Sequence, residues 1–212
     1  MTGNLEASRQ AYRLRKWWIS LPVAITILGS YPGWLFWTDN LHVVKENELY
    51  RSGQMNVSEL AAAVKEHKIR SVLNLRGPNV GVPWYDDETQ ASARLGIEHA
   101  DIALSAKRDV TDEEVSQLDS LLRSLPKPIL VHCQAGGDRV GFVSAYYLHR
   151  FGGIPANEAA KQLSVLFGHF PYLFWSNSIA MDRSFAKYGS DLGFTTAPRR
   201  YAGEDIGLSS TP

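Results

Sequence analysis

The sequence predicts an α/β fold in which a central, mainly parallel sheet is flanked by helices. Short apolar runs typical of buried strands alternate along the chain with amphipathic stretches typical of helices, and this alternation favours a layered fold with parallel strands. Residues 129–141 read as a strand, a loop of small residues and a helix start, which places a ligand-binding loop at the carboxyl end of a strand. An uncharged, largely apolar stretch near the N-terminus adds a predicted transmembrane helix.

The first elements of the predicted domain are two short strands and a helix. Residues His42–Val44 and Glu48–Gln54 read as strands joined by a polar turn. Asn56 is a residue type that caps helices, and the apolar spacing after it predicts a helix over residues 57–66. A buried strand is then expected over residues 71–75, followed by a loop.

The middle of the domain is predicted to contain one helix and one strand. Residues 84–95 form the helix, and the acidic run 86–88 suits the positive end of its dipole. Gly96 is expected to end it. Residues 97–102 follow as a strand, and residues 103–110 as a polar loop.

The second half of the domain is predicted to be mostly helical around one further strand. Thr111 begins a helix that runs to about residue 125, and Glu114 completes a capping box. The apolar run 129–131 reads as a buried strand. Three helices are expected after the next loop, near residues 140–151, 156–167 and 173–187.

Composition limits the possible functions. Lys and Arg together equal Asp and Glu at 22 each, so the net charge of zero argues against non-specific nucleic-acid binding. The single cysteine excludes an intrachain disulfide framework and a thiolate zinc cluster. His99, His149 and His169 show no metal-ligand spacing with Cys133, so no metal or other cofactor is expected.

The N-terminal region predicts a membrane anchor. Residues 1–16 are polar and basic, whereas residues 17–38 carry no formal charge and have tryptophans at both ends, as a single transmembrane helix requires. A cleavable signal peptide is the rival interpretation, but no small-residue cleavage site follows the apolar core. An N-terminal amphipathic or core helix also remains open. The folded domain is expected over residues 41–188, and residues 189–212 read as a loose tail.

Charge on either side of this stretch predicts its orientation. Basic residues precede it, while Asp39, Glu46 and Glu48 follow it. The excess of positive charge keeps the N-terminus in the cytoplasm and sends the rest of the chain across the membrane.

The chemistry-bearing segment begins at Cys133. A loop of small residues that opens a helix binds anions, because successive N–H groups and the helix dipole favour negative charge. A thiolate is nucleophilic and is stabilised at a helix N-terminus beside an arginine, which here is Arg139. Gly136 and Gly137 permit close approach of the backbone to a ligand. The opposing interpretation, a cysteine buried in a core strand, fits a following Gly-Gly-Asp-Arg run poorly.

The same segment resembles the phosphate-binding loop of the cysteine-dependent protein tyrosine phosphatases. It is most similar to bacterial tyrosine and lipid phosphatases, and it also resembles the atypical dual-specificity branch. The similarity extends over about residues 41–170 and implies a dual-specificity phosphatase-like fold. Residues 49–54 and 69–76 carry the wider similarity, and the loop residues that carry the resemblance are His132-Cys133-x-Ala135-Gly136-x-Asp138-Arg139-x-Gly141-Phe142.

The resemblance implies roles for the residues of this loop. Cys133 would be the nucleophile, and His132 would support the loop. The phosphate-binding positions would be Gln134, Ala135, Gly136, Gly137, Asp138 and Arg139. A bacterial source, which the resemblance suggests, would make the protein a single-pass protein of the inner membrane with a periplasmic catalytic domain.

Two carboxylates compete for the role of the acid that protonates the leaving group. In dual-specificity phosphatases this acid lies on a loop roughly thirty residues before the cysteine, and Asp101 lies 32 positions before Cys133. Asp138 is the second candidate, because a loop aspartate has been implicated as the acid in a bacterial branch. Both residues could take part, because Asp101 could protonate the leaving group while Asp138 helps orient water or substrate. Asp109 and Asp112 read as turn and helix-start residues.

Two positions depart from the family pattern. Val140 stands where relatives carry Ser or Thr, whose hydroxyl donates to the cysteine sulfur, so slower breakdown of a phosphoenzyme is expected. Gly137 stands where lipid-directed relatives often carry Lys, which weakens a phosphoinositide preference. Arg51 and Arg76 are expected either to line the pocket or to form salt bridges in the scaffold.

The function expected from the sequence is hydrolysis of phosphotyrosine or phosphoserine/threonine in proteins through a cysteinyl-phosphate. Phosphoinositides or inositol phosphates are the alternative substrates, and membrane attachment would bring lipid headgroups near the site. A catalytically silent phosphate-binding protein is a further alternative. A rhodanese-like sulfur carrier is more distant, because the histidine before the cysteine and the arginine after it favour phosphate.

Overall fold

The computed structural model describes residues 38–172 and 176–190. The predicted membrane-spanning stretch, residues 17–38, lies outside the described residues except for Thr38, as does most of the predicted tail. Within the described ranges, no helix is long and apolar enough to cross a membrane. From Asp39 onward the described residues belong to one compact unit.

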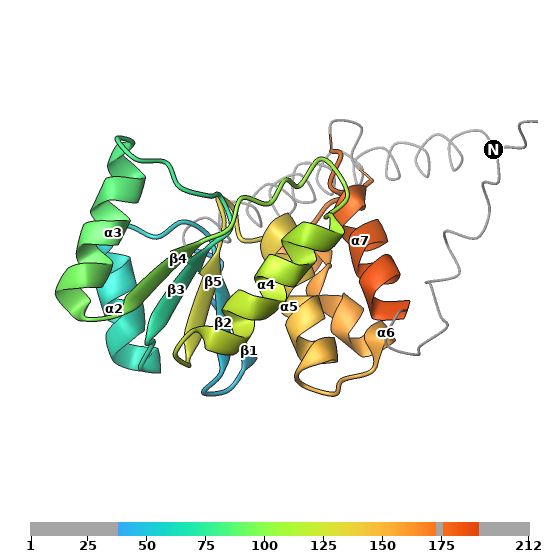
Figure 1. Ribbon diagram of the computed structural model, residues 1–212, viewed down its shortest axis with the longest axis horizontal. Helices are drawn as coiled ribbons and strands as arrows, with labels where there is room; N and C mark the ends of the chain where they lie inside the picture. The colour runs from blue at the N-terminus through green and yellow to red at the C-terminus, as the bar shows by residue number, and fades with distance from the viewer. Residues whose placement is uncertain (1–37, 173–175, 191–212) are drawn as a thin grey trace, which may run out of the picture. The chain divides into compact units, whose positions relative to one another are not determined.

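A five-stranded sheet forms the centre of this unit (Figure 1), with the strand order β1-β2-β5-β3-β4. Only β1 runs antiparallel to its neighbour, and the remaining pairs are parallel, so the predicted mainly parallel sheet is confirmed. The strands are β1 (His42–Lys45), β2 (Leu49–Ser52), β3 (Ser71–Asn74), β4 (Glu98–Asp101) and β5 (Ile129–His132).

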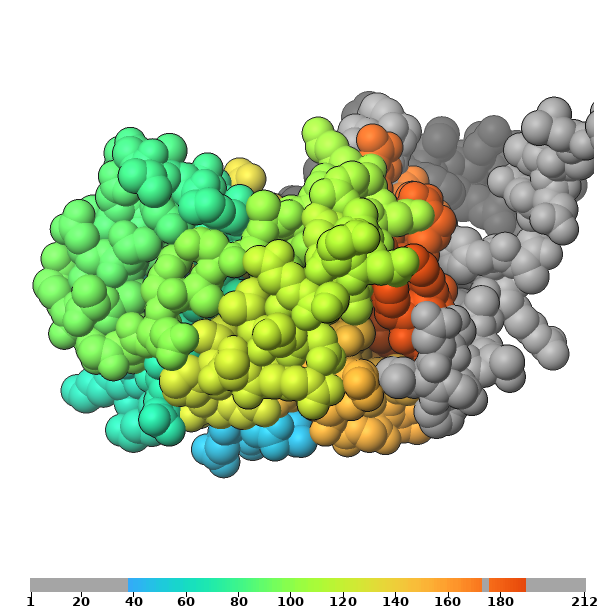
Figure 2. All heavy atoms as spheres, in the orientation of Figure 1, coloured from blue at the N-terminus to red at the C-terminus, as the bar shows by residue number. Residues whose placement is uncertain are grey.

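Helices cover both faces of the sheet. One face carries α2 and α3, and the other carries the remaining helices (Figure 1). In the view of Figure 2, the atoms of α4 and of the loop before it lie at the front, between those of α3 and those of α7. The helices are α2 (Val57–His67), α3 (Pro83–Leu95), α4 (Asp112–Ser124), α5 (Asp138–Arg150), α6 (Ala156–Ala159) and α7 (Ile179–Ser190).

The central strand β5 separates two apolar clusters. Its side chains alternate between the faces of the sheet: Leu130 packs with Leu60 and Ala91 of α2 and α3, whereas Val131 and Cys133 pack with residues of α4, α5 and α7. The alternation directs the side chain of the last β5 residue toward α3 and that of Cys133 toward α5.

The predicted helix boundaries of α2, α3 and α4 are confirmed in their physical detail. Asn56 and Thr111 each accept a hydrogen bond from the N–H three residues on. The backbone N–H of each cap residue in turn donates to the carboxylate of a glutamate. Gly96 ends α3 in the left-handed conformation, with φ of +68°.

Two predicted helices near the C-terminus differ from the structure. The helix expected over 156–167 is broken into α6 and two 3₁₀ turns, η1 (Ala160–Gln162) and η2 (Val165–Phe167). The backbone leaves the helical conformation at Leu163, with φ of −95° and ψ of +72°, and the Gln162 carbonyl accepts a hydrogen bond from the Arg51 guanidinium. The helix expected over 173–187 begins at Ile179 and ends at Ser190.

Candidate active site

The loop predicted from the sequence joins the carboxyl end of β5 to the first residue of α5. β5 lies between β2 and β3, so Cys133 follows the middle strand of the sheet. Its side chain is buried, with 3% of its surface exposed. Because α5 starts at Asp138, two residues earlier than predicted, the positive end of the helix dipole faces the loop.

Four successive carbonyls of this loop are held by donors from other parts of the chain. The Gln134 carbonyl accepts from the Gln54 N–H at 3.1 Å, and the Ala135 carbonyl accepts from Asn40 Nδ2 at 3.0 Å. Arg51 Nη2 donates to the carbonyls of the next two residues, at 2.8 and 3.4 Å. All four carbonyls therefore point away from the interior of the loop.

The N–H groups of the loop are consequently left for a ligand. In a trans peptide the C=O of one residue and the N–H of the next point in opposite directions, so the N–H groups of residues 135–138 point opposite to the bound carbonyls. Within the described chain, none of these groups donates to a protein acceptor. Consecutive free N–H groups at a helix start form an anion-binding cradle.

Two glycines allow the loop to pack this closely. Gly136 has a φ of +74°, and a Cβ there would lie 2.7 Å from the backbone nitrogen of Gly53. At Gly137 a Cβ would lie 2.6 Å from the carbonyl oxygen of Gly168. Side chains at these positions would push the loop away from its neighbours.

Arg51 supports the loop from below. Its side chain is completely buried; besides the loop carbonyls it bonds the carbonyl and the side-chain oxygen of Gln162, at 2.9 and 2.7 Å, and its guanidinium lies over the ring of Phe167. Burial lowers the pKa of Arg51 to about 9, while the charge of Cys133 acts in the opposite direction. Of the two roles expected, the geometry is that of a scaffold, built on carbonyl oxygens instead of salt bridges.

The predicted phosphate ligand Arg139 is oriented by the backbone of two neighbouring segments. Its Nη1 lies 3.3 Å from the Leu75 carbonyl after β3 and 3.4 Å from the Leu104 carbonyl after β4. The guanidinium therefore lies at the same edge of the sheet as Cys133.

A second arginine lies close to this edge. Arg76 follows Leu75 directly; its Nη1 donates to Gln54 Oε1 at 2.9 Å, and its guanidinium stacks 3.6 Å from the centre of the Trp84 ring. Burial and the nearby charge of Arg139 lower its pKa, while Cys133 raises it. Arg76 is thus fixed near the loop without contacting the loop backbone.

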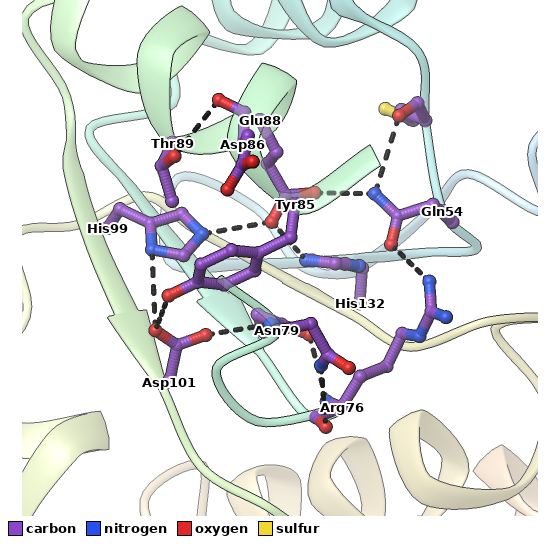
Figure 3. Close-up of polar contacts among 12 residues, drawn as sticks. Gln54, Arg76, Asn79, Tyr85, Asp86, Glu88, Thr89, His99, Asp101 and His132 are labelled. Carbon is purple, nitrogen blue, oxygen red and sulfur yellow. Dashed lines mark hydrogen bonds and ion pairs between the residues drawn. The ribbon is translucent and has the colours of Figure 1, made fainter. Parts of the chain in front are cut away.

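Within the described residues, no hydrogen bond connects the candidate acid Asp101 to the residues of the loop. Asp101 ends β4, and its two oxygens accept hydrogen bonds from Asn74 Nδ2 and the Tyr85 hydroxyl, both at 2.7 Å. The bond to Asp101 is the main reason that the pKa of Tyr85 rises to about 12. Figure 3 shows Asp101 in this cluster with His99.

Asp138, the other candidate acid, is held by a histidine that the sequence analysis did not select. His169 Nδ1 lies 2.6 Å from Asp138, and its Nε2 lies 2.8 Å from Asp182 of α7. Burial tends to lower the pKa of His169, but the two carboxylates raise it to about 9. The ring therefore carries a positive charge at neutral pH and bridges α5 and α7.

Glu88 is a second contact of the loop that was not predicted from the sequence. Its carboxylate is 5% exposed and binds the imidazole of His132, the residue before Cys133 (Figure 3). A signal was present in the sequence, since Glu88 is in helical phase with the apolar Tyr85 and Ala91 on the buried face of α3. Its proximity to the helix start suggested only a favourable dipole interaction.

The fold and the loop define a class of protein. They place a cysteine in an anion-binding loop between the central parallel strand and a helix, as in cysteine-dependent phosphatases. The family model described as "Tyrosine phosphatase family" matches residues 28–160, and the chain belongs to that family. No curated protein matches the sequence.

Solved structures share this fold at low sequence identity. TpbA from P. aeruginosa is 22% identical with a TM-score of 0.51, and the match covers 72% of this chain and 84% of that one. The core catalytic domain of the PP-IP phosphatase SIW14 from S. cerevisiae is 18% identical with a TM-score of 0.53, covering 72% and 92%. PTPMT1 in complex with PI(5)P is 13% identical with a TM-score of 0.54, covering 73% and 99%.

Proposed function

We propose that the protein hydrolyses phosphomonoesters of tyrosine or of serine and threonine in proteins, through a cysteinyl-phosphate at Cys133. The outward-held carbonyls of the loop, which leave consecutive N–H groups for an anion beside the sulfur, carry this proposal. Arg139 offers a planar fork that suits two oxygens of a phosphoryl group.

The reaction has two steps. The Cys133 thiolate attacks phosphorus; an S–P bond forms, the bond to the ester oxygen breaks, and the leaving oxygen takes a proton from an acid. Water then attacks phosphorus and loses a proton to a base, the S–P bond breaks, and phosphate leaves. Loop N–H groups and Arg139 stabilise the charge that builds up on the transferring group.

Hydrolysis of p-nitrophenyl phosphate by the full chain tests the chemistry. We expect activity that vanadate inhibits and that Cys133→Ser abolishes, with a trapped phosphoenzyme detectable in the wild type by mass spectrometry. Tight vanadate or phosphate binding without turnover would identify a silent phosphate-binding protein. Activity that survives Cys133→Ser would exclude the proposed nucleophile.

The acid can be assigned by comparing leaving groups. Asp101 is the proposed acid, and Asp138 is either the competing acid or a residue that orients water or substrate. A phenol leaves less readily than p-nitrophenol and needs its proton more, so loss of the acid should slow phenyl phosphate more than p-nitrophenyl phosphate. We expect one of the two variants, Asp101→Asn or Asp138→Asn, to show this pattern more strongly than the other. A variant that slows phenyl phosphate and p-nitrophenyl phosphate equally would show that the replaced residue is not the acid.

A second candidate substrate class is phosphoinositides or inositol phosphates. Arg76 supports it, because a second fixed guanidinium beside Arg139 suits a substrate with more than one phosphate. Structural neighbours also point to both classes, since one is described in complex with pTyr and others as a PP-IP phosphatase or in complex with PI(5)P. Turnover of a phosphotyrosine peptide, a phosphoserine peptide, PI(5)P and an inositol polyphosphate, measured side by side, separates them.

The proposed location is a bacterial inner membrane, with the N-terminus in the cytoplasm, a single span at residues 17–38 and the catalytic domain in the periplasm. The uncharged stretch with its flanking charges supports this proposal. Fractionation of cells expressing the full chain tests attachment, and protease digestion of spheroplasts tests orientation. Release of the protein into the soluble fraction, without cleavage, would contradict the anchor.

A further inference from the structure

Glu88 is an ionised group inside the protein, next to the loop. It lies in the second turn of α3, and its side chain is 5% exposed. Burial tends to raise its pKa, but hydrogen bonds from His132, His99 and Gln54 lower the pKa to about 2. A buried carboxylate without such partners would be very costly, so these three contacts explain why a charge is tolerated here.

The contacts of Glu88 determine where protons lie on two imidazoles. Oε1 is 3.1 Å from His132 Nε2 and 2.9 Å from His99 Nε2. An ionised carboxylate can only accept hydrogen bonds, so both rings carry a proton on Nε2. His132 Nδ1 is buried and has no partner within the described residues, so Glu88 is the described contact that orients this ring.

Glu88 also reaches the arginine beside the loop. Its Oε2 accepts a hydrogen bond from Gln54 Nε2 at 2.6 Å, and this fixes the amide so that Gln54 Oε1 faces Arg76 Nη1 at 2.9 Å. The Gln54 backbone N–H in turn holds the Gln134 carbonyl of the loop. Figure 3 shows three side chains converging on Glu88 of α3: His99 of β4, His132 of β5 and Gln54 of the segment after β2.

Hydrogen bonds and ion pairs connect the members of this cluster. Within the described part of the chain, no three His, Cys, Asp or Glu side chains are placed to hold a metal ion. Asp101, at the far side of the cluster, lies 3.8 Å from His99 Nδ1. Two carboxylates therefore belong to this cluster: Glu88, which contacts His132 directly, and Asp101, which lies beyond the His99 ring.

We propose that Glu88 is a positioning residue of the phosphatase site, which acts through His132 on the loop and through Gln54 on Arg76. This inference rests on the proposed function. The carboxylate fixes the ring that precedes Cys133 and, through Gln54, the guanidinium of Arg76, whose positive charge favours a thiolate at Cys133. Loss of the carboxylate should therefore make the thiolate harder to form while the phosphate cradle persists.

The first test uses the wild-type chain labelled with ¹⁵N-histidine. NMR should show His132 with a proton on Nε2 that exchanges slowly with solvent and remains between about pH 5 and 8. A His132 ring that carries its proton only on Nδ1 would overturn the proposal, whether or not the protein is an active phosphatase.

The second test follows alkylation of the single cysteine by iodoacetamide as a function of pH. We expect Glu88→Gln to move the midpoint of the profile to higher pH. If the midpoint rises by one pH unit, alkylation at pH values below the midpoint should be about tenfold slower. Asp87→Asn, an exposed carboxylate on the same helix, is the matched control and should leave the profile unchanged. The other charged groups that act on Cys133 or on the helix start beside it stay in place in both variants: Arg51, Arg76, Arg139, Asp138 and His169.

A double-mutant cycle shows whether the effect passes through His132. In a His132→Asn background, Glu88→Gln should move the midpoint less than it does in the wild type, and the shift that remains measures the route through Gln54 and Arg76. An unchanged or lowered midpoint in folded Glu88→Gln would show that its carboxylate does not support the thiolate. Alkylation needs no turnover, so a protein that fails as a phosphatase still gives a clear result on Glu88.

Discussion

The guanidinium of Arg51 lies wholly inside the protein and donates to the carbonyl of Gly136 at 2.8 Å. This contact joins β2 to the loop after β5, 85 residues away in the sequence. It fixes the orientation of a peptide whose N–H belongs to the proposed phosphate site. A charge in the scaffold thus determines the direction of a dipole in the site.

Replacement of Arg51 should therefore affect both stability and activity. Arg51→Met leaves the carbonyls of Gly136 and Gln162 without their charged donor, and we expect a loss of about 3 kcal/mol in the free energy of unfolding. Urea unfolding followed by tryptophan fluorescence measures this loss. Arg70→Met removes an exposed arginine and should cost little. Equal stability of the two variants would contradict the scaffold role.

The close packing of the loop predicts a contrast between two glycines. Gly136 and Gly153 both have positive φ, of +74° and +66°, but only at Gly136 would a Cβ meet backbone atoms within 4 Å. Gly153→Ala should cost about 1 kcal/mol of backbone strain. Gly136→Ala adds a clash with the turn at Gly53, so it should be clearly less stable and lose phosphatase activity.

Calorimetry and activity assays of both variants separate strain from clash. If Gly136→Ala behaved like Gly153→Ala, the loop would have room to move away from Gly53. The N–H cradle would then be less rigid than the described contacts require.

His169 should make stability depend on pH. The pKa of His169 is about 9 in the folded protein, above the ordinary histidine value, so its contribution is complete below about pH 6.5 and is lost as pH rises through 9. We expect about 3 kcal/mol to be lost over this interval. Urea unfolding at several pH values should show this decline.

Two variants isolate the histidine. His169→Gln should flatten the decline between pH 6.5 and 9, and Asp182→Asn, which leaves only Asp138 as a partner, should reduce it. A decline that persists unchanged in His169→Gln would assign it to other groups. Both variants change the hydrogen bonds that hold Asp138 through His169, so both should also alter activity if Asp138 moves a proton.

Val140 should limit the second chemical step. It is completely buried directly after Arg139, at the position where the family resemblance implies a hydroxyl. Val140→Thr keeps the shape and adds one hydrogen bond, which should speed phosphoenzyme hydrolysis roughly two- to tenfold. Burst kinetics with p-nitrophenyl phosphate measure that step. Val143→Thr, buried one turn further along α5, is the control, and unchanged or slower turnover in Val140→Thr would contradict the expectation.

Local patterns were sufficient to predict most of the fold and the position of the loop. Residues 129–131 form a buried strand because every side chain is apolar, and the glycines that follow permit the tight loop. Asn56 and Thr111 marked helix starts because capping depends on residues only three positions apart. These features need no knowledge of distant contacts.

The partners of the site could not be predicted in the same way. Asn40 holds the Ala135 carbonyl across 95 residues, and His169 meets Asp138 across 31. No local pattern encodes such pairs. The helix expected over residues 156–167 was wrong: the backbone leaves the helical conformation at Leu163, next to a Gln162 carbonyl that bonds Arg51 from 111 residues away.

Within the described residues, none of the three guanidiniums around the loop, those of Arg51, Arg76 and Arg139, forms a salt bridge with a carboxylate. Their surplus positive charge will attract any small tetrahedral oxyanion in solution. Sulfate or phosphate carried over from purification will therefore compete with substrate, and rates measured in phosphate-buffered saline will understate the capacity of the enzyme.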